Sequence, residues 1–431
     1  MEFPEALEWL TARVNLEWIR TPGRPRPPSL DRMHELMMLM AEPQRQYPVV
    51  HITGTNGKTS TARLAARLLG ATGLGVGLYT SPHLERINER ISRNGVPIDD
   101  SELAEVISAV AQLEPLLTEP PTFFDALTSA AFRWFADVAV DAAVVEVGML
   151  GTWDATNVVD GAVAVVTNVG PDHLDYAPTL EMIAREKAGI VKAGSTLVLG
   201  ETEAAYASIF ASTPAAAIWR RDEDFGVLAN EVAHGGRLVS LRTPGARYHD
   251  VFLSLHGAFQ ADNAAVALAA VEAFLGRAVD GSVVEEAFAT ATSPGRVEIA
   301  GRAPLVVLDG AHNPPAAEAL ALTLVEEFGD AEPWTVVLGV LTPHDPADLL
   351  AALDQVRIGT VVATEPGFAP RAVPAETVAA AAEEAGYDTV VATPVVSAVR
   401  KAVAAAGAAG RVLVTGSLYT VGNAKAALRD R

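Results

Sequence analysis

The chain has no cysteine among its 431 residues. Disulfides, thiolate zinc sites and cysteine nucleophiles are therefore excluded, and any metal must be held by oxygen or imidazole ligands. Basic side chains are also scarce, because 32 lysines and arginines stand against 53 aspartates and glutamates and give a formal net charge of -21. This charge repels nucleic acid and anionic lipid, so the sequence predicts neither as a partner.

Membrane and secretion signals are missing too. No apolar run approaches the length needed to span a membrane, and residues 1–6 contain no basic stretch followed by an apolar one. These absences predict a cytoplasmic enzyme. An acidic protein that handles anionic substrates must gather its few cations locally, which draws attention to Lys58, Lys187 and Arg296.

The length of the chain and its hydrophobic content of 50% exceed what one ordinary core requires, so two domains are expected. Residues 5–19 carry apolar side chains at helical spacing, residues 21–28 break that pattern, and a second helix begins near Leu30. About 50 residues therefore precede the first expected strand.

From residue 49 the pattern alternates between strand and helix, which is typical of a mostly parallel α/β sheet. The expected strands are residues 49–53, 75–79, 142–147, 163–167 and 196–199, and the expected helices are 58–71, 101–117, 179–191 and 260–274. Residues 225–256, with Gly235 and Gly236 between short alternating segments, indicate antiparallel strands that close this first domain, residues 1–294.

Residues 292–296 indicate a linker, after which the alternation restarts. The second and smaller domain, residues 295–431, is expected to be α/β and Rossmann-like. Its expected strands are residues 305–308, 334–340, 361–362 and 411–415, and its expected helices are 315–328 and 376–385, with alanine-rich residues 404–409 also favouring helix.

A glycine-containing segment between an apolar strand and an amphipathic helix has the setting of a phosphate-binding loop. The loop consists of Gly54, Thr55, Asn56, Gly57, Lys58, Thr59 and Ser60. Its glycines let backbone N–H groups turn toward phosphate oxygens, Lys58 can reach the outer phosphates, and a hydroxyl of Thr59 or Ser60 can hold magnesium. The strict loop pattern requires glycine where Ile52 stands, so this is a shorter variant, and a chance glycine turn is the alternative.

Nucleotide-bound magnesium needs one or two carboxylates or hydroxyls from strand ends near the loop. Glu146 fits, because it lies within the apolar run 142–147, where a carboxylate without a partner would be costly. A structural ion pair is the alternative for Glu146. His173 follows the next strand in the same way, although a loop histidine taken alone is more often unremarkable than a ligand.

Two further places carry weaker signals. Lys187 lies near the end of an expected helix, where a solvated surface lysine is the ordinary interpretation and a second phosphate or metal contact is the alternative. Residues 309–314, Asp-Gly-Ala-His-Asn-Pro, follow a strand of the second domain, at the edge where open α/β sheets bind ligands. An ordinary Asp-Gly turn is equally compatible with that segment.

Taken together, these residues resemble the folylpolyglutamate synthase and dihydrofolate synthase family of the Mur ligase superfamily, and the resemblance covers almost the whole chain. The matching motifs, in chain order, are residues 51–58 (HITGTNGK), 80–84 (TSPHL), 89–91 (ERI), 146–148 (EVG), 154–157 (DATN), 172–173 (DH), 186–190 (EKAGI), 256–257 with Gln260 and Asn263, 293–296 (SPGR), 309–314 (DGAHNP) and 415–419 (TGSLY). So many matches in order are hard to obtain by chance.

The resemblance implies roles for individual residues. Magnesium would be held by Thr59, Ser81, Glu146 and His173. ATP would be bound by the phosphate loop together with Asn263, Arg296 and Asp309. The counterpart of Lys187 is a lysine carboxylated by carbon dioxide, whose carbamate serves at a second metal or beside the γ-phosphate. Residues near the folate-type substrate would be Thr122, Phe124, Asp125, Trp153, Asp154 and Ala155, and weaker candidates for holding glutamate are His312 and Ser417.

The implied reaction is the ATP-dependent ligation of L-glutamate to dihydropteroate, to a folate, or to both. The substrate carboxylate attacks the γ-phosphate, and the amino group of glutamate captures the acyl phosphate, so that ADP and phosphate leave. Lys58, magnesium and the loop N–H groups would stabilise the transferring phosphoryl group, with His173 and Lys187 as further catalytic candidates. Closure of the second domain at a Pro294–Gly295 hinge would exclude water, and a monomer is the expected state.

Three departures from the family pattern stand out. Thr59 replaces a glycine, Leu150 and Thr152 replace a glycine and an arginine, and residues 341–346 lack the usual Asp-Lys-Asp signature. These departures motivate a catalytically silent nucleotide-binding paralogue as one rival function. A UDP-muramyl amino-acid ligase is the other, disfavoured because the roughly 50 residues before the loop are too few for a Rossmann-type UDP-binding domain.

Overall fold

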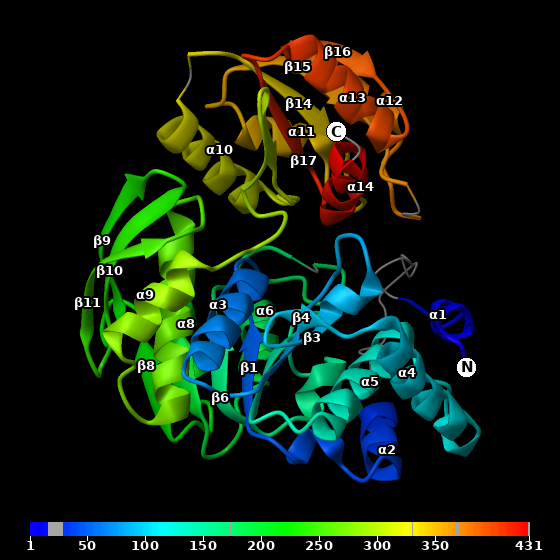
Figure 1. The fold of residues 1–431 in the computed structure, drawn as a ribbon, viewed down its shortest axis with the longest axis vertical. Helices are drawn as coiled ribbons and strands as arrows, with labels where there is room; N and C mark the ends of the chain where they lie inside the picture. The colour runs from blue at the N-terminus through cyan, green and yellow to red at the C-terminus, as the bar shows by residue number, and fades with distance from the viewer. Residues whose placement is uncertain (16–28, 173, 330, 368–369, 430–431) are drawn as a thin grey trace.

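The computed structural model describes residues 1–15, 29–172, 174–329, 331–367 and 370–429. Its elements form two lobes, one from roughly the first two thirds of the chain and the other from the last third (Figure 1). Each lobe contains a mostly parallel sheet with helices on both faces, so the expected α/β class is confirmed. Among the described helices, none combines the length and the apolar character that crossing a membrane requires.

The first lobe is organised around an eight-stranded sheet in the order β4-β3-β2-β5-β1-β6-β7-β8. Its strands are β1 (Val49–Thr53), β2 (Val76–Tyr79), β3 (Ile91–Arg93), β4 (Val96–Pro97), β5 (Ala142–Glu146), β6 (Gly161–Val166), β7 (Thr196–Leu199) and β8 (Ala217–Arg220). Six neighbouring strands, β2, β5, β1, β6, β7 and β8, run parallel. At one edge of the sheet, β3 pairs antiparallel with β2, and β4 pairs antiparallel with β3. Central strand β1 is buried along its whole length, which explains its nearly continuous apolar sequence.

Helices cover both faces of this sheet. Alternate residues of β1 divide between the faces: Ile52 packs in the cluster with α3 (Lys58–Ala71) and α8 (Phe259–Leu275), and Val49 packs in the cluster with α4 (Asp100–Leu113) and α5 (Phe123–Asp137). The other helices of the lobe are α1 (Phe3–Thr11), α2 (Asp31–Leu39), α6 (Leu180–Ala188), α7 (Ala207–Ala211) and α9 (Gly281–Ala289). Its single-turn 3₁₀ helices are η1 (Pro43–Arg45), η2 (Ile87–Arg90), η3 (Glu114–Leu116), η4 (Ala155–Val158) and η5 (Ala204–Tyr206).

A small antiparallel sheet stands beside α8, where residues 225–256 predicted one (Figure 1). Its strands are β9 (Gly226–Ala233), β10 (Gly236–Arg242) and β11 (Arg247–Leu253), with β10 in the middle. The turn between β9 and β10 needs the left-handed conformation at Gly235, whose φ is +81°, and glycine adopts it without steric cost.

The second lobe has a six-stranded sheet in the order β12-β13-β17-β14-β15-β16. Its strands are β12 (Glu298–Arg302), β13 (Leu305–Leu308), β14 (Trp334–Leu338), β15 (Ile358–Ala363), β16 (Asp388–Val391) and β17 (Arg411–Thr415), of which only β12 is antiparallel to its neighbour. Its helices are α10 (Pro314–Phe328), α11 (Pro346–Ala352), α12 (Ala375–Glu384), α13 (Val395–Ala406) and α14 (Leu418–Arg429). Separate hydrophobic clusters on the two sheet faces show that both are covered.

Several predicted boundaries were wrong. The first helix ends at Thr11 rather than at residue 19, and residues 16–19 lie outside the described part of the chain. The helix expected at 101–117 ends at Leu113 and is followed by η3. Helix α13 covers Val395–Ala406, so the alanine-rich pattern at 404–409 marked only its end. Helices α5, α7, α9, α11 and α14 were not predicted at all.

Candidate active site

A cavity of about 1110 Å³ lies between the two lobes. Its walls include the loops at the carboxyl ends of β1, β5, β6 and β13, together with the start of α5 and part of α8. Open α/β sheets bind their ligands at this edge, because the loops that follow neighbouring parallel strands meet there. The two sheets of this chain face one common space in that way.

The expected phosphate loop connects β1 to α3 and forms part of the wall. Gly57 has a φ of +82°, and a Cβ placed on it would lie 2.3 Å from Oδ1 of Asn263, so both conformation and space require glycine. The Lys58 ammonium folds over the loop and donates to the carbonyls of Gly54 at 2.9 Å and Thr55 at 3.1 Å. The first turn of α3 leaves backbone N–H groups without intrahelical partners, which suits a phosphate.

Thr167 and Asn168, which directly follow β6, hold the phosphate loop in place, and the sequence reasoning missed both. The side-chain oxygen of Asn168 accepts from the N–H groups of Thr55 at 3.1 Å and Asn56 at 2.9 Å. The hydroxyl of Thr167 donates to the Asn56 carbonyl at 2.7 Å. Their position directly after a buried strand, the reason for choosing Glu146, was the available signal.

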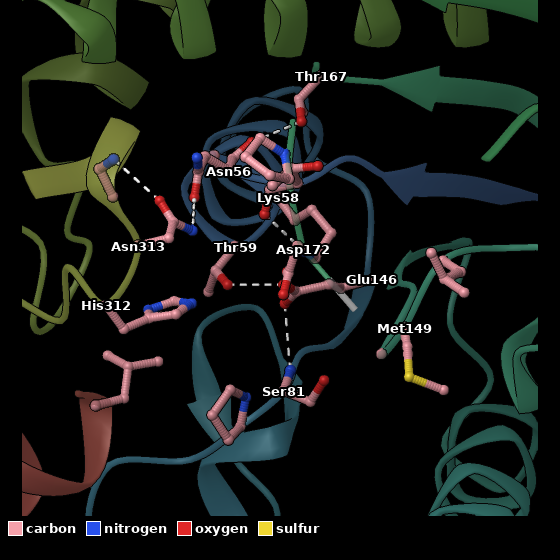
Figure 2. Close-up of a pocket in the computed structure, with 18 of the residues that line it drawn as sticks. Asn56, Lys58, Thr59, Ser81, Glu146, Met149, Thr167, Asp172, His312 and Asn313 are labelled. Atoms are coloured by element: carbon pink, nitrogen blue, oxygen red, sulfur yellow. Dashed lines mark hydrogen bonds between the residues drawn. The ribbon is translucent and has the colours of Figure 1, made fainter. Parts of the chain in front are cut away.

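Two of the residues expected to hold a metal, Thr59 and Ser81, contact a third, Glu146, at the end of β5 (Figure 2). This side chain is only 1% exposed. It accepts from the Thr59 hydroxyl at 2.7 Å and from the Ser81 N–H at 3.2 Å. Burial raises the pKa of Glu146, while Lys58 and these hydrogen bonds oppose the rise.

The oxygen atoms of these side chains are suitable ligands for a hard cation. A carboxylate and two hydroxyls are the few protein ligands that nucleotide-bound magnesium takes, since it keeps much of its water. Among the described residues, no group of three histidine, aspartate or glutamate side chains is arranged to bind a metal by itself. His173 lies outside the described residues, while its neighbour Asp172 lines the cavity.

Lys187 lies on α6 and is 2% exposed, so the interpretation of a solvated surface lysine was wrong. It makes no hydrogen bond or ion pair with any part of the chain that the structure describes. Burial lowers the pKa of Lys187 well below its usual value, and the nearby Lys58 charge lowers it further while Asp172 opposes them. Burial therefore favours the neutral amine.

The three residues expected to reach ATP from outside the loop all line the cavity. Asp309 follows β13 and accepts from the N–H groups of Val297 at 2.9 Å and Ala311 at 2.7 Å. Burial raises its pKa, and the charge of Arg296 counteracts that rise. The Asn263 amide donates to Gln260 at 2.9 Å.

The hydroxyl of Ser60 is engaged away from Glu146. It lies 2.9 Å from the hydroxyl of Ser293 and is buried. Of the two hydroxyls predicted for magnesium, therefore, Thr59 is the one placed against the carboxylate. The replacement of glycine by Thr59 adds a donor to the site.

The six residues expected around the folate-type substrate also line the cavity. Thr122 and Asp125 cap α5 reciprocally, through Asp125 N–H to the Thr122 hydroxyl at 3.1 Å and Thr122 N–H to the carboxylate at 3.0 Å. Arg32, which sequence reasoning missed, donates to the same carboxylate at 3.1 Å and lines the cavity. Trp153 is 43% exposed, so its ring is available to a ligand.

Thr152, one of the departures, ties its loop to the helix that carries Lys187. Its N–H and its hydroxyl both donate to the Glu186 carbonyl, at 3.0 and 3.1 Å. A Cβ placed on Gly189 would lie 2.1 Å from the Thr152 hydroxyl, so the packing is close. The substitution therefore has a local structural role.

The second lobe contributes a histidine pair. Nδ1 of His312 donates to the Gly310 carbonyl at 2.8 Å, and the rings of His312 and His344 meet edge to face with centroids 5.2 Å apart. Burial lowers the pKa of His312, and it lowers the pKa of His344 to about 4. Ser417 lines the cavity, but its hydroxyl accepts from the Thr420 N–H at 3.0 Å. Sequence reasoning missed His344 as a site residue, although it noted the unusual segment 341–346.

Asn313 joins the lobes at the centre of the cavity, where its amide donates to Oδ1 of Asn56 at 3.3 Å (Figure 2). His312 approaches from the same side. The phosphate loop, the Glu146 carboxylate and the strand-end residues of the second lobe thus share one space. Such an arrangement can bind a nucleotide and close over a second substrate.

Two family models match this chain. The Mur ligase middle domain matches residues 52–271, and the Mur ligase, glutamate ligase domain matches residues 295–418. The dihydrofolate synthase/folylpolyglutamate synthase of Mycobacterium tuberculosis is 42% identical over 385 residues, which are 83% of this chain and 78% of that protein.

Solved structures agree over the full length. The Mycobacterium tuberculosis folylpolyglutamate synthase complexed with ADP and AMPPCP matches with a TM-score of 0.90 at 38% identity, covering 99% of this chain and 98% of that one. A bifunctional folylpolyglutamate synthase/dihydrofolate synthase from Yersinia pestis, complexed with AMPPNP and Mn ion, matches with a TM-score of 0.83 at 26% identity, covering 100% of this chain and 98% of that one.

Proposed function

Because the chain belongs to the Mur ligase family and, within it, to the dihydrofolate and folylpolyglutamate synthases, we propose that it ligates L-glutamate to a folate-type carboxylate with ATP. The observation that carries this proposal is that the phosphate loop, Glu146 and the aromatic side chains of Phe124 and Trp153 line one shared cavity. A nucleotide, a carboxylate acceptor and an amine must come together in one water-poor space for acyl-phosphate chemistry.

The chemistry runs in two steps. An oxygen of the acceptor carboxylate attacks the γ-phosphorus of ATP, and the bond to the ADP oxygen breaks. The amino group of glutamate then attacks the acyl carbon, an amide forms, and phosphate leaves. Lys58 and the N–H groups at the start of α3 stabilise the negative charge on the phosphoryl group.

Thr59, Ser81, Glu146 and His173 are the proposed magnesium ligands, with His173 outside the described residues. When bound, the ion neutralises phosphate charge and fixes the β- and γ-phosphates relative to the acceptor. The buried Glu146 carboxylate supports this assignment, because Lys58, the cation that most lowers its pKa, donates its hydrogen bonds to loop carbonyls instead. The manganese in the Yersinia pestis relative supports a divalent cation as well.

Lys187 is proposed to carry a carbamate formed with carbon dioxide. The reaction needs a neutral amine, and burial beside Lys58 favours that form of Lys187. A carbamate would also place a negative group near the Lys58 ammonium, and the two opposite charges would attract each other. It would then serve beside the γ-phosphate or at a second metal ion.

The two lobes divide the remaining work. Residues 1–294 are proposed as the ATP- and folate-binding domain, and residues 295–431 as the glutamate ligase domain. His312 and Ser417 are proposed to hold the incoming glutamate, Ser417 through its backbone because its hydroxyl is already bonded. A monomer acting in the cytoplasm is the proposed state of the enzyme.

The test measures ADP release from purified protein with ATP, magnesium, glutamate and either dihydropteroate or a reduced folate. Release that requires both acceptor and glutamate supports the ligase, and comparison of the acceptors assigns the reaction. Lys58→Ala serves as the inactive control and should lose about 100-fold or more in turnover. Nucleotide binding without turnover would show a silent paralogue instead.

A further inference from the structure

A buried series of hydrogen bonds leads from the central strand β1 to Asp154, which lines the cavity. Nε2 of His51 lies 2.9 Å from the hydroxyl of Thr156, and that hydroxyl donates to Oδ1 of Asp154 at 2.5 Å. His51 and Thr156 are fully buried, and Asp154 lines the cavity. None of the roles described above uses His51 or Thr156.

The donor and acceptor of each of these hydrogen bonds follow from counting protons. The hydroxyl of Thr156 has one hydrogen, and it goes to Asp154, so the oxygen must accept the N–H of His51. His51 is then protonated on Nε2 alone. Its Nδ1 has no hydrogen-bond partner among the described residues, which suits a lone pair better than a buried N–H without an acceptor. Burial and the nearby Lys192 lower the pKa of His51 to about 3, so the ring stays neutral.

The same count leaves the Asp154 carboxylate with one unused hydrogen-bond acceptor position. Oδ1 accepts from both the hydroxyl and the N–H of Thr156, the latter at 3.0 Å, and Oδ2 accepts from the N–H of Met149 at 2.9 Å. A carboxylate offers about four acceptor positions, so one remains, on Oδ2. Met149 stands at the edge of the pocket in Figure 2, and Asp154 itself borders the cavity.

We propose that His51 and Thr156 are positioning residues that hold the Asp154 carboxylate as a fixed acceptor for an N–H donor of the acceptor substrate's pterin ring. This proposal rests on the proposed function, because it assumes a folate-type acceptor. Any fused heterocycle with adjacent amino and ring N–H donors would satisfy the same oxygen. His51 cannot reverse the direction of these hydrogen bonds, since its Nδ1 has no hydrogen-bond partner in the described part of the protein.

A purely structural role is the competing explanation, because Asp154 also caps η4 through the Thr156 N–H. That backbone bond survives any change at the Thr156 side chain. Thr156→Val removes the hydroxyl at nearly constant volume, and Thr156→Ser keeps it. If positioning is the role, Val and Ser must differ in acceptor binding and agree in nucleotide binding.

The experiment measures dissociation constants for dihydropteroate and tetrahydrofolate in the presence of a non-hydrolysable ATP analogue. We expect Thr156→Val to weaken acceptor binding about tenfold or more and to raise KM for the acceptor more than it changes kcat. Thr156→Ser should restore wild-type affinity, and the analogue should bind all variants equally. His51→Leu should resemble Thr156→Val.

Thr323→Val is the matched control, because Thr323 is a buried threonine of α10 whose hydroxyl donates to the Ala319 carbonyl of its own helix at 2.8 Å. It should leave acceptor affinity unchanged. Equal acceptor affinity in the Val and Ser variants would overturn the proposal, and so would loss of nucleotide binding and cooperative melting in both Thr156→Val and His51→Leu. Wild-type protein that binds neither acceptor refutes the proposed function instead.

Discussion

Arg237 and Glu327 form a buried ion pair between the two lobes, with Nη1 of the guanidinium 2.8 Å from Oε1 of the carboxylate. Arg237 is on β10 and 1% exposed, and the Glu327 side chain, at the end of α10, is 2% exposed. His256 lies 2.6 Å from the other carboxylate oxygen, and the Gly257 N–H donates to the carboxylate at 2.7 Å. Although burial raises the pKa of Glu327, these hydrogen bonds hold it below its usual value.

Glu327→Ala should destabilise the protein by about 3 kcal/mol, since it leaves the buried guanidinium without one of its partners. The neighbouring Glu326 also pairs with Arg237, at 2.9 Å, but its side chain is 45% exposed. Glu326→Ala should therefore cost less than about 1 kcal/mol. Chemical denaturation of both variants measures the difference, and equal costs would contradict the view of Glu327 as the buried anchor between the lobes.

Gly57→Ala should weaken nucleotide binding. The new Cβ would meet Oδ1 of Asn263 at 2.3 Å, in a conformation with φ of +82° that costs an L-residue about 1–2 kcal/mol. Loop and Asn263 must both shift, so we expect ATP affinity to fall about tenfold or more. Titration of the purified variant with a fluorescent nucleotide measures this.

Gly70→Ala is the control for that substitution. Gly70 lies in the same helix, α3, and nothing stands within 4 Å of a Cβ placed on it. Alanine should leave nucleotide binding unchanged and should stabilise the helix by up to about 1 kcal/mol. A loss of affinity in both variants would mean that the loop tolerates no change in the helix at all, rather than a specific clash.

The parts of the fold that sequence predicted well are those with a local signal. Strand β1 has the bounds that its apolar run predicted, and helix α3 has the bounds that its helical pattern predicted. Helix α5 was missed, although the reciprocal cap of Thr122 and Asp125 marked its start. Its buried residues include the polar side chains of Asp125, Thr128 and Ser129, so polarity along the sequence does not separate its buried side from its exposed side.

Site residues divide in the same way. Thr59, Ser81 and Glu146 come from three separate segments, and their meeting follows from parallel strands ending at one edge. Arg32 and His344 had no such signal, since their place in the wall depends on how distant elements pack. The burial of Lys187 also escaped detection, because the loop around Thr152, which is bonded to its helix, lies about 35 residues earlier.

Acceptor binding should weaken as the pH falls through about 6. Burial raises the pKa of Asp154 to about 6, against hydrogen bonds from Thr156 and Met149, and the charge of Asp125 adds to the rise. The folded protein thus holds this proton more tightly than the unfolded chain, and protonation turns an acceptor oxygen into a donor. Titration of acceptor binding without ATP and metal tests this, with Asp154→Asn expected to remove the step. Binding that is constant between pH 5 and 8 would contradict it.

Lys187→Met should abolish ligation and leave the fold intact. Methionine fills similar volume without a buried amine, so the variant should melt at or above the wild-type temperature, while turnover falls about 100-fold or more. Lys187→Arg keeps a long basic side chain but cannot form the carbamate, so it should be equally inactive, and Lys187→Ala should be inactive too. Wild-type activity should drop in bicarbonate-depleted buffer and return when bicarbonate is added.

Lys192→Ala is the control, because that lysine donates to the Asn157 carbonyl at 3.0 Å and lies outside the cavity wall. Full activity in Lys187→Met, or indifference to bicarbonate, would remove the carbamate.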